Sequence, residues 1–105
     1  MAWIYLLAAG VLEIVWAFAM KQSDGFSKLT PSIITIAGMI ASFWLLALAM
    51  RTLPLGPAYT IWTGIGAVGA FVIGIVFLGE HVSAMRIAAA VLIVSGLVLM
   101  KVSSA

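Results

Sequence analysis

Four long apolar runs alternate with short polar connections along the chain. They cover residues 2–20, 32–50, 58–78 and 84–100. Each run is close to the ~20 residues that an α-helix needs to cross the hydrocarbon core of a bilayer. Because short connections join antiparallel neighbours, we expect residues 1–105 to form one all-α domain of four transmembrane helices, with both chain ends on the same side of the membrane.

Residues that favour helix starts precede three of these runs. Thr30-Pro31 and Gly56-Pro57 resemble an N-cap followed by a proline in the first turn, where the missing N–H is unimportant. Ser83 precedes the fourth run, and its hydroxyl suits an N-cap. We therefore expect helices to begin just after Thr30, Gly56 and Ser83.

The composition excludes several classes of protein. Hydrophobic residues make up 66% of the chain and charged residues only 8%, whereas soluble domains are ~25% charged. Cysteine is absent, so disulfides and thiolate chemistry are excluded. His81 with Glu80 is too small a group for a metal site, and the five basic residues form no cluster that would indicate nucleic-acid binding. We expect no metal and no cofactor.

The basic residues in the connections do not favour one orientation in the membrane. Arg51 and Lys101 belong to one side, and Lys21, Lys28 and Arg86 to the other. Because Lys and Arg in short loops set the orientation, three against two predicts insertion both ways round. Two opposite copies can then form an antiparallel homodimer, which resembles the inverted repeats of transporters. The alternative is that another factor fixes a single orientation.

One ionisable residue, Glu13, lies near the middle of the first run. At ~1.5 Å per residue it is ~17 Å from the start of the helix, near the centre of a ~30 Å hydrocarbon layer. A charge at this depth costs at least ~2.5 kcal/mol, so such residues usually have a function. The alternative is a neutral, hydrogen-bonded carboxyl that only packs. We favour a functional role for this carboxyl.

Small, hydroxylic and aromatic residues recur at positions that can surround this acid. Gly10 shares its helix face, and Trp16 lies one turn beyond it. Ser42 places a hydroxyl at mid-depth in the second run, while Tyr59 and Trp62 lie one turn apart in the third. Paired rings can stack on a planar cation. The alternative for Tyr59 and Trp62 is the aromatic belt at the membrane surface.

The third run contains a glycine motif that could be mistaken for a dinucleotide-binding motif. Gly64–Gly69 has the pattern GxGxxG, but it lies inside an apolar helix and follows no strand, so it does not indicate dinucleotide binding. In a membrane helix, glycines permit close packing and local bending. We expect a hinge near Gly64 and Gly66, with close packing alone as an equal alternative.

The fourth run is the best candidate for a seam between two copies. Ala89 and Gly96 lie seven residues apart on one face, and Ser95 is adjacent. The interior of this run has no charge and no aromatic residue, so it suits a dimer interface better than a transport path. The alternative is packing within one chain.

Four segments carry a resemblance to a known family. They are Leu12–Ala17 with Lys21, Gly25–Pro31, Leu53–Gly56 and Ala58–Ala67. Over its whole length the chain resembles the small multidrug resistance transporters. It is most similar to their guanidinium-exporter subtype, because Trp16 follows the acid and Trp62 begins a Trp-Thr-Gly-Ile-Gly run.

The resemblance implies an antiparallel homodimer in the bacterial inner membrane that exports guanidinium in exchange for protons. It implies that Glu13 of both copies binds either protons or substrate. The residues that match the family's pocket by position are Trp16, Ser42, Tyr59 and Trp62, with Gly10 beside the acid. We expect the Ser42 hydroxyl and the Trp62 N–H to orient the carboxylates.

Two positions depart from the subtype. Thr60 stands where alanine is usual, and Pro57 where threonine is usual. Because Thr60 adds a hydroxyl and a methyl next to Tyr59, we expect it to affect selectivity. A broader exporter of quaternary ammonium ions therefore stays open as an alternative. A non-transporting membrane subunit is a further alternative, although it leaves Glu13 unexplained. We do not expect an enzyme, because the sequence shows no nucleophile paired with a base.

Overall fold

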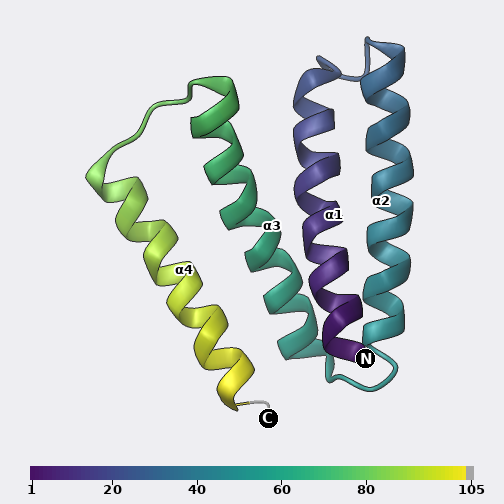
Figure 1. Cartoon of the computed structure of the whole chain (residues 1–105), viewed down its shortest axis with the longest axis vertical. Coiled ribbons are helices and arrows are strands. Elements are labelled where there is room, and N and C mark those ends of the chain that lie inside the picture. The colour runs from purple at the N-terminus through teal and green to yellow at the C-terminus, as the bar shows by residue number, and fades with distance from the viewer. Residues whose placement is uncertain (104–105) are drawn as a thin grey trace.

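The computed structural model describes residues 1–103, whose regular secondary structure is helical. The helices are α1 (Ala2–Gln22), α2 (Leu29–Ala49), α3 (Leu55–Leu78) and α4 (Ala84–Ser103). Each of them is long and apolar enough to cross a membrane, so the prediction of four membrane-length helices is confirmed. Successive helices run in opposite directions, and the first residue lies at the same end of the bundle as the end of α4 (Figure 1).

The second and third helices begin earlier than the sequence pattern predicted. Leu29 and Leu55 are their first residues, and neither N-cap makes a side-chain capping bond. Thr30 and Gly56 lie inside the first turns, so their assignment as caps is wrong. The physical reason is that the first four N–H groups of any helix lack helical partners. A proline is therefore tolerated at the third position of a helix as well.

The turn between α3 and α4 has a capping residue at each end, of which Ser83 was predicted. Gly79 ends α3 with φ +66°, a left-handed conformation that glycine adopts without steric cost. The Glu80 N–H then donates to the Gly74 carbonyl at 3.0 Å. At the start of α4, the Arg86 N–H donates to the Ser83 hydroxyl at 3.2 Å, as the predicted N-cap requires.

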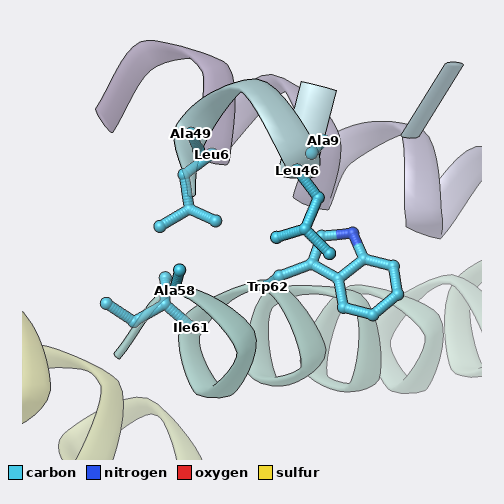
Figure 2. Close-up of a cluster of buried hydrophobic side chains, with 7 residues drawn as sticks. All are labelled: Leu6, Ala9, Leu46, Ala49, Ala58, Ile61 and Trp62. Carbon is cyan, nitrogen blue, oxygen red and sulfur yellow. The ribbon is translucent and has the colours of Figure 1, made fainter. Parts of the chain in front are cut away.

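The packed part of the molecule consists of α1, α2 and α3. Helix α1 lies between α2 and α3, whereas α4 contacts α3 and diverges from the other helices (Figure 1). Figure 2 shows the buried apolar cluster, which comprises Leu6, Ala9, Leu46, Ala49, Ala58, Ile61 and Trp62. Helix α4 has no buried residue. The candidate site therefore depends on how α1, α2 and α3 fit together.

Glycines set the closest approaches between the helices. A Cβ added at Gly10 would lie 2.9 Å from the Cβ of Ile65, so α1 and α3 are in intimate contact there. A Cβ at Gly64 would collide with the Leu97 side chain of α4. These contacts agree with the use of small residues at helix interfaces in membranes.

Candidate cation-binding site

The carboxyl group of Glu13 lies in the contact between α1 and α3. It rests on Gly66, where an added Cβ would overlap with the carboxyl carbon and Oε1 of Glu13. Among the residues that the structure describes, Oε1 is buried and has no hydrogen-bond partner. Glycine at position 66 therefore provides the space that the carboxyl occupies, and the acid is left available to a ligand.

A hydrogen-bonded link joins three helices beside this acid. The Trp62 Nε1–H donates to the Ser42 hydroxyl at 3.0 Å, and that hydroxyl donates to the Ala9 carbonyl at 2.7 Å. Ser42 is fully buried, and Trp62 is 6% exposed. Both donors are therefore engaged with each other and with the backbone in the single chain, and their orientation of the Glu13 carboxylates stays a prediction. A buried indole N–H needs an acceptor, and the nearby hydroxyl supplies it.

Four aromatic rings form a continuous series across α1, α2 and α3. Tyr59 and Trp62 have ring centroids 5.5 Å apart, and Trp62 meets Phe43 at 5.6 Å with an interplanar angle of 64°. Phe43 in turn meets Trp16 at 6.3 Å and 74°. The Trp16 Nε1 is buried without a hydrogen-bond partner in the described part of the chain. The site thus combines a free donor with ring faces and edges.

Phe43 was not predicted from the sequence. It follows Ser42 directly and lies at the same depth, and this proximity was the available signal. The Phe43 ring contacts both Trp16 and Trp62, and it therefore connects these two rings. An aromatic residue beside a predicted site hydroxyl can therefore belong to the same site even when, as for Phe43, 46% of its surface is exposed.

The predicted hinge and selectivity residues lie at different surfaces of α3. Gly66 contacts Glu13, and Gly64 contacts Leu97, while α3 continues as one helix through both positions. The hinge therefore stays a prediction. Thr60 is exposed and lines a cleft of about 520 Å³ between α3 and α4. Tyr59 lines the same cleft, so one end of the aromatic series borders this space.

The three predicted seam residues are exposed on α4. Ala89 and Gly96 line clefts between α3 and α4, whereas Ser95 lines a separate groove. A Cβ added at Gly96 would meet no atom within 4 Å. Within one chain this face has no close neighbour at Gly96, and the dimer seam stays a prediction.

Replacing Ser42 with alanine is expected to destabilise the fold. The change leaves the buried Trp62 N–H without its acceptor, which costs about 1–3 kcal/mol. Thermal unfolding in detergent should show a lower midpoint for Ser42→Ala. Ser32→Ala is the matched control, because its hydroxyl bonds to the Lys28 carbonyl at the exposed start of the same helix. If both variants unfold at the same temperature, the link through Ser42 does not hold the helices together.

These features define a class of protein. Four membrane-length helices with a mid-depth carboxyl at a helix contact are typical of a small membrane transporter whose ionisable group takes part in transport. The model of the Small Multidrug Resistance protein family matches residues 1–104, and the chain belongs to this family. It is therefore a multi-pass membrane transporter and not an enzyme, as the sequence predicted.

Individual relatives are similar over nearly their entire length. The guanidinium exporter of Escherichia coli (strain K12) is 56% identical over 104 residues, which cover 99% of each chain. The guanidinium exporters of Citrobacter freundii and Salmonella typhimurium are 57% identical to this protein over 104 residues, which again cover 99% of each chain. The resemblance to the guanidinium-exporter subtype is confirmed.

Proposed function

We propose that this protein exports guanidinium from the bacterial cytoplasm across the inner membrane in exchange for protons. Relatives that are 56–57% identical over 99% of the chain are named guanidinium exporters. The observation that carries the proposal for the site is the Glu13 carboxyl, which is held at mid-depth with a buried oxygen that has no partner among the described residues.

The chemistry of guanidinium fits the groups around this acid. Guanidinium is planar and donates paired hydrogen bonds to a carboxylate, as an arginine side chain does. Its face can also stack on the rings of Trp16 or Trp62. A proton on the carboxyl removes the charge and one acceptor oxygen. Protons and guanidinium therefore compete for Glu13, and this competition couples their opposite flows.

An antiparallel homodimer completes the mechanism. In one chain α4 has no buried residue, so it is available to a partner. A second copy inserted the other way round supplies a second Glu13 and turns the pair into an inverted repeat, which can open alternately to each side. The two acids then titrate as one coupled pair. The near balance of basic residues between the two sides supports insertion in both orientations.

A broader exporter of quaternary ammonium ions is the second candidate. The cleft of about 520 Å³ beside Tyr59 and Thr60 favours it, because substituents too bulky for the aromatic series would fit there. Quaternary ammonium ions lack N–H groups and cannot hydrogen-bond to the carboxylate. Affinity for the two kinds of cation therefore separates the candidates.

Guanidinium is expected to bind more tightly than tetramethylammonium, and its affinity is expected to fall as the pH is lowered, because protons then occupy Glu13. Losing charge-assisted hydrogen bonds worth about 1.5–3 kcal/mol weakens binding ~10-fold or more. Calorimetric titration of the purified protein at several pH values measures both effects. Equal affinities would favour the broader exporter, and affinity independent of pH would contradict a site shared with protons.

A further inference from the structure

An apolar groove lies on the opposite side of Leu97 from the cleft at Tyr59. It has a volume of about 380 Å³ and is lined by all three of α1, α3 and α4, for example by Leu7, Ile65 and Val98. No residue of the aromatic series beside Glu13 lines it. The groove is therefore separate from the candidate cation site.

One end of the apolar groove is positively charged. Lys101 lines that end, and its Nζ lies 4.4 Å from the centroid of the Trp3 ring. The acidic side chains of the sequence are Glu13, Asp24 and Glu80. The first is at mid-depth, and the other two belong to connections at the opposite end of the bundle (Figure 1). Lys101 thus has an aromatic ring beside it but no acidic side chain at its end of the molecule.

We propose that the apolar groove binds an acyl chain of an anionic phospholipid, whose phosphate contacts Lys101. Lysine and tryptophan at the end of a membrane helix lie at the level of the lipid headgroups. From Lys101 to Val94 the groove follows α4 for seven residues, or ~10 Å into the hydrocarbon. An acyl chain beneath a charged phosphate has this shape and charge pattern.

The position of the predicted dimer seam argues against a second copy of α4 as the occupant. The predicted seam residues Ala89 and Gly96 do not line the apolar groove, so a dimer formed through them leaves the groove open to lipid. A phosphate at the end of the groove neutralises the ammonium group of Lys101.

The experiment measures how many phospholipids stay bound to the full-length protein in detergent. Native mass spectrometry with phosphatidylglycerol and, separately, phosphatidylcholine gives an affinity for each lipid. Phosphatidylglycerol should bind more tightly, and Lys101→Gln should weaken it about fivefold while leaving phosphatidylcholine unchanged. Arg51→Gln is the matched control, because Arg51 is exposed at the same end of the bundle and does not line the groove.

Two further measurements test the position of the lipid. Val98→Phe fills the groove without changing charge, so it should weaken both lipids. Inorganic phosphate at the same concentration should not displace phosphatidylglycerol; displacement would show a simple anion site instead. Equal losses in Lys101→Gln and Arg51→Gln would overturn the proposal, because they would indicate general attraction to the positive end. A cysteine at position 98 that crosslinks to a cysteine near the Arg86 end of α4 in an antiparallel second copy would overturn it as well.

Discussion

Replacing Glu13 with glutamine is expected to abolish proton-coupled guanidinium transport and leave the four-helix fold intact. Glutamine has nearly the same shape as glutamate, so it can still occupy the space above Gly66. It carries no charge and accepts no titrating proton. Removing one member of a buried charge pair costs about 2–5 kcal/mol, so guanidinium binding should weaken at least ~30-fold.

Transport by reconstituted liposomes under an imposed pH gradient measures this effect. Radiolabelled guanidinium should accumulate with the native protein and stay at the level of empty liposomes with Glu13→Gln. Glu80→Gln is the control, because it removes an exposed carboxyl in the α3–α4 connection and should transport at nearly the native rate. Exchange of guanidinium for protons by the Glu13→Gln variant would show that the two ions do not share this acid.

The positions of the helices were predictable because membranes impose a strong length requirement. Every backbone polar group must be satisfied inside the segment, so a run of ~20 apolar residues has few alternatives to a helix. The starts were less predictable. Pro31 and Pro57 each lie at the third position of a helix, and proline fits anywhere in a first turn. The sequence pattern therefore located these helices but placed their first residues too late.

The residues that form the site were easier to predict from the sequence than the contacts between them. Periodicity indicated that Gly10 and Glu13 share a face, and both approach α3 in the structure. Periodicity could not indicate the register of α2 against α1, that is, the offset of the two helices along their axes. That register decides that the Ser42 hydroxyl bonds to the Ala9 carbonyl instead of to the acid. Contacts between helices depend on this fit of side chains, which the pattern of one helix does not contain.

The roles of Trp62 and Phe43 illustrate the same limit. The sequence favoured a site role for Trp62 and left the aromatic belt as the alternative, and the side chain is buried within the chain. Its hydrogen bond to Ser42 and its ring contact with Phe43 come from a different helix. Residues of α2 thus complete a site that the sequence predicted mainly from α1 and α3.

Replacing Gly66 with alanine is expected to reduce guanidinium transport at least ~100-fold without unfolding the protein. The added methyl would occupy the present position of the Glu13 carboxyl. Because that carboxyl ends a flexible side chain, it can move away at little cost to the fold. A displacement of ~1 Å in an acting group can nevertheless cost ~100-fold in rate.

Gly56→Ala is the matched control for this prediction, since Gly56 lies in the same helix and an added Cβ there would meet no atom within 4 Å. Alanine is favoured over glycine inside helices by about 0.5–1 kcal/mol, so this variant should unfold at the native temperature or above and transport normally. Gly66→Ala should also keep a native-like unfolding midpoint while losing both transport and guanidinium binding. Normal transport by Gly66→Ala would show that the carboxyl does not need its place on α3. Loss of transport with native binding would instead indicate that Gly66 acts as a hinge, because bending affects the passage between states and not the site itself.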